Sequence, residues 1–360
     1  MNLGIDISQI VYKGTGVARF TRGLVNGILK YEKKNHWLFF FSGLRQKLDS
    51  DLKEKILSKK HRLIEWPIPP KALAQLWNDW HTVGIVPKEF FKLDLFITSD
   101  WTEPKIKGIK KATIVHDLVF KKYPETVENN ILNTQKKRLD WVAKESDIIF
   151  ADSEATRNDL LSFYDLKDKK ISVNYPGVEV TKPLNTVRRT KPFILTVGKL
   201  EPRKNLPKLV EAFSKMGNED IDLLIVGPRG WQNLDNKFNI KNVKIMEFVS
   251  DHELYNLYTS CLFFVYPSLW EGFGIPVIEA MKLGAPVACS DTSSIKEIAK
   301  DAALTFDPES TESILLSLKK MAGNESIRRR LVKKGYENAA KFTWENYYDK
   351  MMKSIYDNRS

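Results

Sequence analysis

Short apolar runs alternate with longer amphipathic stretches along most of the chain. Nearly continuous apolar runs separated by amphipathic helices are typical of parallel β-strands that are covered on both faces. The first half contains the runs LGIDI, ATIVHDL, DIIFAD and ISVNYPGV, and the second half contains PFILTVG, DLLIVGP, VKIMEFV, LFFVYPS and PVACSD. The pattern predicts an α/β protein made of doubly wound, Rossmann-like parallel sheets.

The chain of 360 residues is long enough for two hydrophobic cores, because single cores rarely grow past about 250 to 300 residues. The polar, basic and proline-bounded segment EVTKPLNTVRRTKP (179–192) separates the two sets of strands and is the best linker candidate. We therefore expect one domain over 1–185 and a second over 186–342. Their active site should lie in a cleft between them, at the carboxyl ends of the strands, where open sheets bind ligands.

The last segment, FTWENYYDKMMKSIYDN, reads as an amphipathic helix. Its apolar side is made of Trp344, Tyr348, Met351, Met352 and Ile355. We expect this helix, over 343–360, to cross back and pack on the first domain.

The chain has 57 Lys and Arg against 45 Asp and Glu, a net charge of +12. Up to Asn185 the balance is 31 against 23, so most of the excess lies in the first half. A basic balance of this size suits nucleic acid, an anionic membrane face, phosphorylated small molecules, or simply a lysine-rich solvated surface. The lysines are spread evenly, which argues against nucleic acid.

Localisation signals are weak. The start MNLGIDISQI lacks the basic and apolar regions of a signal peptide, and no apolar run approaches the roughly 18 residues of a membrane span. Cys261 and Cys289 lie in apolar, strand-like contexts without a metal-binding spacing, which suits buried thiols in a reducing compartment. We expect a cytoplasmic protein, peripheral on the inner membrane face if its basic side meets anionic lipid.

A glycine turn, GTGVAR (14–19), follows the first strand and precedes a helix. Arg19 replaces the third glycine of the dinucleotide-binding pattern, and seven residues separate Asp6 from Gly14, too many for its tight turn. A plain turn or a loop that binds phosphate or hydroxyl groups at the cleft edge fits better than a nicotinamide site.

His116 and Asp117, in VHDL, end another strand pattern. Loops after parallel strands often carry the chemistry of such folds, although a lone histidine there can equally be structural.

The segment TVGKLEPRKN (196–205) places Arg203 and Lys204 between a strand and a helix. Helix N-termini favour anions, and a guanidinium beside an ammonium suits a diphosphate. The alternative is ordinary surface charge.

Two glutamates bracket a glycine turn in EGFGIPVIEA (271–280). We expect the helix to begin near Ile275, with Glu271 in the loop before it and Glu279 about one turn inside it. Carboxylates accept hydrogen bonds from hydroxyls, and the backbone N–H groups of 272–274 can bind anionic oxygen. This combination suits a polyol that carries phosphate, whereas a favourable helix-dipole position would account for Glu279 alone.

Asp49 and Asp51 form an Asp-x-Asp pair of the kind that holds a divalent metal in one class of sugar-nucleotide transferases. They lie in a polar helix-start context without a preceding strand, so a helix cap is the better interpretation.

Taken together, these motifs resemble family 4 of the retaining glycosyltransferases with the GT-B fold, in particular bacterial polysaccharide mannosyl- and glucosyltransferases. The resemblance runs over nearly the whole chain and rests on GTGVARFTRGLV, VHDL, SEATRNDL, YPGVE, GKLEPRKN, FVSDHELYNLY and EGFGIPVIEAM, in that order.

The resemblance implies a role for each matching residue. Arg203 and Lys204 would neutralise the diphosphate of the donor, Glu271 with the backbone of Gly272, Phe273 and Gly274 would hold the transferred sugar, and Glu279 would bind the ribose hydroxyls. His116 would contact the sugar near the reacting centre, and Gly16 would lie close to the diphosphate or the acceptor. Gly198 lies on the donor side, and the backbone at Phe248 and Val249 would meet the base.

The resemblance also implies the reaction. A hexose would pass with retention, and without a metal or other cofactor, from a nucleoside diphosphate sugar to a glycan or lipid-linked acceptor in cell-surface polysaccharide synthesis. Mannose from GDP-mannose is favoured, and UDP-linked sugars stay open. The alternatives are an epimerase or hydrolase of the same fold, and a non-enzymatic basic protein that binds glycan or nucleic acid.

The acceptor is expected on the first domain. Aromatic and basic residues alternate there in HWLFFF (36–41), WPIPPKALAQLWNDW (66–80) and SDWTEPKIKGIKK (99–111), which suits saccharide rings or an anionic membrane. Phe39 to Phe41 also read as strand core. Trp77 and Trp80 lie three residues apart on one helix face, and the alternative for them is simple packing against the sheet.

Overall fold

The computed structural model describes residues 1–12, 14–166, 170–183, 190–230 and 240–358. It divides into two compact units, Met1–Gly177 with Thr343–Ser360 (unit 1) and Val178–Phe342 (unit 2). The chain thus passes into unit 2 before the linker expected over 179–192. The predicted boundary at 185/186 lies outside the described residues.

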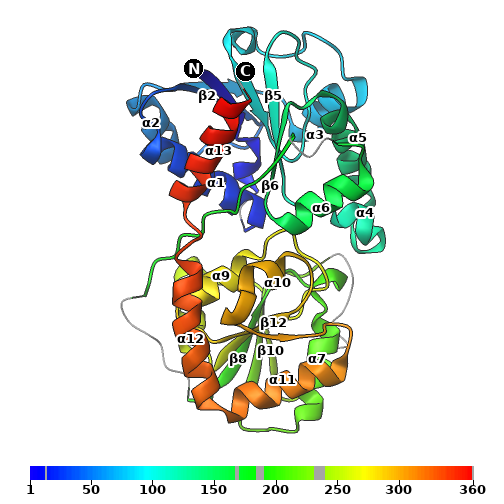
Figure 1. The fold of residues 1–360 in the computed structure, drawn as a ribbon, viewed down its shortest axis with the longest axis vertical. Helices are drawn as coiled ribbons and strands as arrows, with labels where there is room; N and C mark the ends of the chain where they lie inside the picture. The colour runs from blue at the N-terminus through cyan, green and yellow to red at the C-terminus, as the bar shows by residue number, and fades with distance from the viewer. Residues whose placement is uncertain (13, 167–169, 184–189, 231–239, 359–360) are drawn as a thin grey trace. The chain divides into compact units, whose positions relative to one another are not determined.

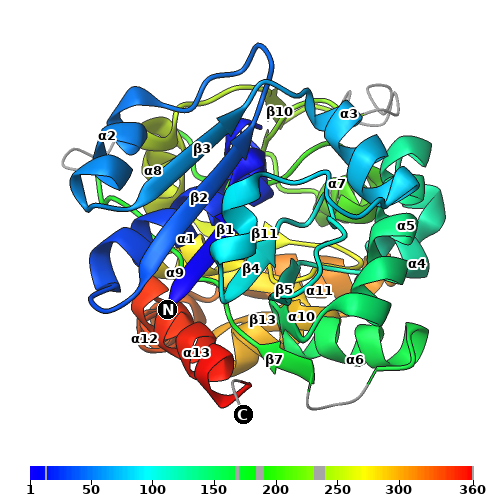
Figure 2. The same cartoon turned by 90° about the horizontal axis from the view of Figure 1, so that it is seen from above.

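Unit 1 contains a parallel sheet (Figures 1 and 2). Over the described residues it has seven strands in the order β3-β2-β1-β4-β5-β6-β7. Their bounds are β1 (Asn2–Asp6), β2 (His36–Ser42), β3 (Arg62–Trp66), β4 (Leu95–Thr98), β5 (Lys110–Val115), β6 (Ile148–Ala151) and β7 (Ile171–Val173). From β1 the chain adds β2 and β3 on one side of the sheet and β4 to β7 on the other, so the topological switch point lies between β1 and β4. Open sheets of this kind bind ligands at that point.

Helices cover both faces of this sheet. Residues that alternate along the strands explain why: Phe39 and Ile114 pack toward α1, whereas Phe40 and Val115 pack toward the other face. The helices of unit 1 are α1 (Gly16–Tyr31), α2 (Ser50–Ser58), α3 (Pro70–Ala74), α4 (Val119–Lys122), α5 (Asn129–Glu145), α6 (Glu154–Phe163) and α13 (Trp344–Asp357), with 3₁₀ turns at Ser8–Val11, Lys88–Lys92 and Pro124–Thr126.

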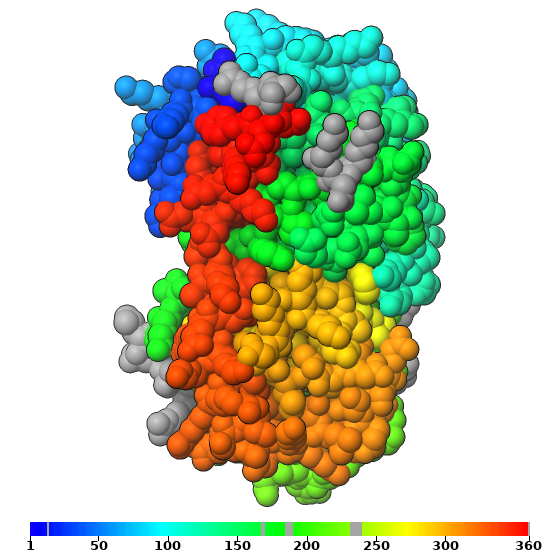
Figure 3. Space-filling model, in the orientation of Figure 1, coloured from blue at the N-terminus to red at the C-terminus, as the bar shows by residue number. Residues whose placement is uncertain are grey.

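The C-terminal helix α13 returns to unit 1, as predicted, and lies against α1 (Figures 2 and 3). Its predicted apolar side is buried in the same core as β1 and β2. The buried residues are Trp344, Tyr347, Tyr348, Met351, Met352 and Ile355.

Unit 2 contains a second parallel sheet. Over its described residues the order is β10-β9-β8-β11-β12-β13. The strands are β8 (Phe193–Val197), β9 (Asp222–Val226), β10 (Val243–Met246), β11 (Phe263–Tyr266), β12 (Val287–Ser290) and β13 (Leu304–Phe306). The helices are α7 (Leu206–Met216), α8 (Asp251–Ser260), α9 (Ile275–Lys282), α10 (Ser293–Ala299), α11 (Thr311–Gly323) and α12 (Glu325–Ala339), with 3₁₀ turns at Pro202–Lys204 and Lys300–Ala302. The predicted α/β class with two Rossmann-like sheets is confirmed.

Two local predictions are wrong. Trp77 is buried but Trp80 is 62% exposed, because residues Gln75–Trp80 form a π-helix, whose wider turn moves the two rings off a common face. Cys261 is half-buried just after α8 instead of lying in a strand, whereas Cys289 is buried in β12 as expected.

The Asp49 carboxylate caps helix α2, as predicted. It accepts hydrogen bonds from the backbone N–H groups of Asp51 and Leu52, at 3.0 and 3.4 Å. Among the described residues, no helix is long and apolar enough to cross a membrane.

Candidate functional site

The parallel sheet of unit 2 brings the predicted basic pair and one of the two glutamates together. Strands β8 and β11 are hydrogen-bonded neighbours, so the loops that follow them emerge side by side at the carboxyl edge of the sheet. Arg203 and Lys204 lie in the 3₁₀ turn after β8, and Glu271 lies in the loop after β11. The backbone joins the two loops, because the N–H of Leu269 donates to the carbonyl of Arg203 at 2.9 Å.

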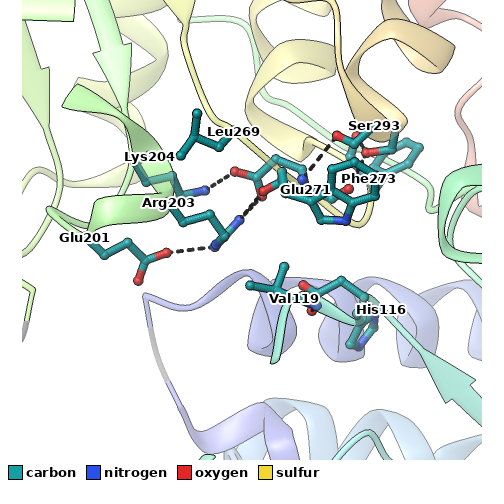
Figure 4. Close-up of polar contacts among 12 residues, drawn as sticks. His116, Val119, Glu201, Arg203, Lys204, Leu269, Glu271, Phe273 and Ser293 are labelled. Atoms are coloured by element: carbon teal, nitrogen blue, oxygen red, sulfur yellow. Dashed lines mark hydrogen bonds and ion pairs between the residues drawn. The ribbon is translucent and has the colours of Figure 1, made fainter. Parts of the chain in front are cut away.

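The Glu271 carboxylate divides its two oxygens between the two cations (Figure 4). Oε1 is 2.6 Å from Nζ of Lys204, and Oε2 is 2.6 Å from a terminal guanidinium nitrogen of Arg203. The hydroxyl of Tyr266 donates to Oε1 at 3.0 Å, and Lys204 also donates to that hydroxyl at 2.9 Å. These side chains form a closed, largely buried cluster.

Burial alone would raise the pKa of Glu271, but Arg203 and Lys204 outweigh it and lower that pKa to about 2. Burial would lower the pKa of Lys204, and the adjacent carboxylate of Glu271 instead raises it. Burial and the same carboxylate raise the pKa of Tyr266 to about 12. At neutral pH Arg203 and Lys204 are therefore cations, Glu271 is ionised and Tyr266 is a neutral phenol.

Arg203 is held by two further acceptors. One of its terminal nitrogens donates to the carbonyl of Trp270 at 2.8 Å, and the other donates to the carboxylate of Glu201 at 2.7 Å. The side chains of Arg203, Lys204 and Glu271 are only 16%, 12% and 10% exposed. This placement excludes the alternative that the basic pair is ordinary surface charge.

Serines from the start of α10 hold the glycine turn. Ser293 accepts from the N–H of Glu271 at 3.2 Å, and Ser294 donates to the carbonyls of Glu271 and Phe273 at 2.8 and 3.1 Å. Gly274 follows with φ +100°, a backbone conformation that residues other than glycine rarely adopt. Helix α9 begins at Ile275, as predicted. The turn over 272–274 is thus fixed beside the ion cluster.

Gly198 lies beside the aliphatic part of Lys204. A Cβ at this position would be 3.3 Å from Cδ and Cε of Lys204, tighter than an ordinary contact. Gly227, after the neighbouring strand β9, is more constrained, because its Cβ would be 2.1 Å from the carbonyl oxygen of Gly198. The missing side chains let two loops and the lysine approach closely.

Glu279 lies inside α9, as predicted, and is 3% exposed. Tyr258 of α8 donates a hydrogen bond to its Oε2 at 3.3 Å. The expected nucleotide-side residues, Phe248 and Val249, follow β10 at the same edge of the sheet, and the Phe248 side chain is 87% exposed. The roles of these three residues stay predictions.

The other predicted site residues belong to unit 1. His116 directly follows β5, and its Nδ1 lies 2.6 Å from Oδ2 of Asp152, which directly follows β6. Gly16 is the first residue of α1, after Thr15, whose hydroxyl caps the helix by accepting from the N–H of Ala18. A Cβ at Gly16 would meet no atom of the described residues within 4 Å, so this position leaves open space at the helix start.

Sequence reasoning missed several residues of the two clusters: Glu201, Tyr266, Ser293 and Ser294 in unit 2, and Asp152 in unit 1. Tyr266, Ser293 and Asp152 all follow or end recognised strand patterns, and that position was an available signal. Glu201 gave no signal, because a glutamate two residues before an arginine is common on surfaces.

Chemically, unit 2 offers buried, fixed cations beside a rigid glycine turn and a helix start. Such an arrangement binds an anionic group while carboxylate oxygens accept hydrogen bonds from neighbouring hydroxyls. The loop after β10, two strands away from β8, carries the exposed ring of Phe248.

Comparison with known proteins agrees with this chemistry. The family model "Glycosyltransferase Family 4" matches residues 15–182, and "Glycosyl transferases group 1" matches residues 179–338, so together they span most of the chain. The chain is 26% identical to the O-antigen chain mannosyltransferase B of Escherichia coli, over 66% of this chain and 68% of that protein.

A second relative is the serotype-specific mannosyltransferase WbdA of Escherichia coli, which is 26% identical over 94% of this chain. The match covers 45% of WbdA, so the chain corresponds to less than half of that relative. Among solved structures, sucrose-phosphate synthase from Thermosynechococcus elongatus superposes with a TM-score of 0.75 at 17% identity, over 99% of this chain and 98% of that one. That likeness concerns the fold.

Proposed function

The chain belongs to the family 4 glycosyltransferases of the GT-B fold, and we propose that it transfers a hexose from a nucleoside diphosphate sugar. The acceptor is a glycan or a lipid-linked saccharide of cell-surface polysaccharide synthesis, and the reaction takes place in the cytoplasm. Mannose from GDP-mannose is the favoured donor, because two relatives are named as mannosyltransferases of O-antigen or serotype-specific chains.

The observation that carries the proposal is the Arg203–Glu271–Lys204 cluster. Glu271 holds both cations at 2.6 Å, so they stay charged and oriented inside a largely buried site. In the transfer step the bond from the sugar to the diphosphate breaks, and negative charge grows on the leaving diphosphate. Fixed cations stabilise that charge most where it has developed fully, which lowers the barrier.

The same geometry argues against Glu271 as a nucleophile. Both of its oxygens are engaged by cations, and Tyr266 donates to one of them as well. Its pKa of about 2 also leaves no proton for it to donate at neutral pH. Retention then fits a front-face reaction in which the leaving phosphate takes the proton of the acceptor hydroxyl.

The remaining assignments follow from position. Glu271 and the turn 272–274 hold the transferred sugar, Glu279 binds the ribose hydroxyls, and the backbone at 248–249 meets the base. His116 contacts the sugar near the reacting centre. Two cations at the diphosphate take the part that a divalent metal plays in other transferases, so we propose a metal-independent reaction.

The test is transfer and binding with a panel of GDP- and UDP-linked hexoses, each with and without EDTA. We expect one donor to bind and to release its nucleoside diphosphate, and EDTA to leave the rate unchanged. Failure of every donor to bind would refute the transferase, and loss of the rate with EDTA would refute metal independence. Release of free sugar at the same rate with and without acceptor would indicate a hydrolase.

A further inference from the structure

The His116 imidazole of unit 1 is held on several sides. Strands β5 and β6 are neighbours in register, with Val115 opposite Ala151, so the residues that follow them, His116 and Asp152, meet at the edge of the sheet. Oδ2 of Asp152 lies 2.6 Å from Nδ1 of the imidazole. The ring of Phe20, from α1, packs edge-on against the imidazole with centroids 4.6 Å apart.

The backbone at this position is fixed as well. The hydroxyl of Thr156, in the first turn of α6, donates to the carbonyl of His116 at 3.0 Å. With Nδ1 bonded to Asp152 and the ring packed on Phe20, the imidazole has one remaining polar atom, Nε2. The described residues give Nε2 no hydrogen-bond partner, although the side chain is 18% exposed.

We propose that Asp152 is a positioning residue that keeps a proton on Nδ1 of His116 and directs Nε2–H toward an oxygen of the bound sugar. The inference rests on the proposed function, since it assumes that His116 faces the transferred sugar or the acceptor. His116 is then a hydrogen-bond donor to an electron-rich oxygen, and it does not act as a general base.

The surroundings support this protonation state. Burial would lower the pKa of His116, but the carboxylate of Asp152, assisted by Asp100 and Asp117, raises it to about 9. Asp152 is 4% exposed, and its second oxygen, Oδ1, has no hydrogen-bond donor among the described residues. The imidazole is therefore the main hydrogen-bond partner of this carboxylate, so the negative charge of Asp152 acts chiefly on His116.

One other titratable group faces the pair from a packed helix. The hydroxyl of Tyr347, on α13, is buried without a hydrogen-bond partner in the described part of the chain, and burial together with Asp152 raises its pKa well above the ordinary value. A neutral phenol adds no second negative charge beside the pair. Burial raises the pKa of Asp152 above its ordinary value, and the adjacent His116 opposes that rise.

A direct test uses nitrogen NMR of the whole protein labelled at histidine. The chain has five histidines, so the His116→Gln variant assigns the signals. We expect both ring nitrogens of His116 to stay protonated up to a pH near 9. In Asp152→Asn the midpoint should fall to 6.5 or lower. A wild-type midpoint at or below that value would overturn the proposal whatever donor the enzyme uses.

Kinetics of the same variants test the consequence. Asp152→Asn should lower kcat by about tenfold to a hundredfold, the size expected when a charge-assisted hydrogen bond to the sugar oxygen is lost. Asp152→Glu, which keeps the charge, should recover part of the loss. Asp147→Asn is the matched control. Asp147 is exposed, directly precedes β6 at the end away from Asp152, and accepts a hydrogen bond from the N–H of Lys111 at 2.8 Å.

The two failures are distinguishable. A loss in Asp152→Asn that appears only in KM, or one no larger than in Asp147→Asn, overturns the positioning role while the transferase stands. An enzyme that uses no nucleotide sugar refutes the proposed function, and the NMR titration still decides whether Asp152 sets the protonation of His116.

Discussion

The indole of Trp344, the first residue of α13, occupies the space that a side chain at Gly23 of α1 would need. A Cβ built on Gly23 would lie 2.2 Å from Cζ2 of the indole. Gly177, the last residue of unit 1 before the chain leaves it, faces the same residue, and its Cβ would lie 2.4 Å from the backbone nitrogen of Trp344. The return of the chain to unit 1 is therefore anchored at positions where only glycine fits.

Gly23→Ala should destabilise unit 1 even though alanine is the better helix former. The added methyl must displace a buried indole, and overpacking of this kind costs about 1 to 3 kcal/mol. Thermal unfolding followed by tryptophan fluorescence measures the loss. Gly323→Ala is the control, since a Cβ there would meet nothing within 4 Å. Equal melting temperatures for Gly23→Ala and the wild type would show that α13 adjusts freely.

Loss of the Glu271 carboxylate should abolish most transfer. Glu271→Gln leaves Arg203 and Lys204 buried without their shared counterion, and Lys204→Met removes one of the two cations. Each should lower kcat by roughly a hundredfold or more, as expected for groups that hold developing charge. Glu211→Gln is the control, because Glu211 accepts a hydrogen bond from Lys215 at 2.7 Å on the exposed surface of α7. Transfer by Glu271→Gln within a few-fold of wild type would contradict the role given to the cluster.

Alanine substitutions at Gly198 and Gly227 should lower donor affinity by different amounts. Gly198→Ala adds a methyl at 3.3 Å from the flexible lysine chain, so the lysine can yield and we expect a moderate loss of donor affinity. Gly227→Ala places its methyl 2.1 Å from the carbonyl oxygen of Gly198, where backbone must move. Calorimetric titration with the donor should show the larger loss for Gly227→Ala. The reverse order would mean that Lys204 is not held by this pair of loops.

Much of this site could be predicted from the sequence, because its residues directly follow apolar strands that are easy to recognise. Glu271, Arg203 and His116 lie where the pattern placed them, at the carboxyl ends of β11, β8 and β5. The direct pairing of Glu271 with both cations could not be predicted. It depends on β8 and β11 being neighbours, and strand order is a property of the tertiary fold that no local pattern encodes.

Three strands, β3, β4 and β13, were not recognised from the sequence. β3 is an edge strand with polar Arg62 and Glu65, and β13 is an edge strand of three residues with exposed Thr305. β4 is as short and as buried as the recognised β6, and no physical reason sets it apart. Trp80 was misplaced because the π-helix of 75–80 breaks the regular helical period. These failures lie away from the strand ends that form the clusters.

Glu32 makes unit 1 sensitive to acid. Burial raises its pKa, but hydrogen bonds from the N–H groups of Asn35 and Lys34, from Trp37 and from Tyr348 of α13 lower it to about 2. A lowered pKa means that the stabilisation is complete above the ordinary value of 4.5 and is lost as the pH falls toward 2. Glu32→Gln should lower the melting temperature at pH 7, and the difference from wild type should shrink below pH 4.5. A difference that stays constant from pH 7 to pH 2 would exclude this linkage.

We predict that unit 1 meets an anionic membrane through the exposed residues around Trp80. Trp80 and Val83 are 62% and 43% exposed, and His81 between them stacks on Trp141 with centroids 3.8 Å apart. The ammonium of Lys144 lies 4.8 Å from the Trp141 ring, so an indole and a cation are presented on one surface. Tryptophan favours the headgroup region, and each nearby lysine contributes about 1 kcal/mol on an anionic surface.

Co-sedimentation with phosphatidylcholine vesicles, with and without phosphatidylglycerol, tests this surface. We expect binding only with the anionic lipid, a clear loss in Trp80→Ala, and about a fivefold loss in Lys144→Gln, which corresponds to about 1 kcal/mol. Phe163→Ala is the control, because Phe163 is an exposed aromatic residue at the end of α6. Equal binding to both vesicle types, or equal losses in Trp80→Ala and Phe163→Ala, would show that the surface does not select the membrane. The acceptor would then have to reach the enzyme from solution.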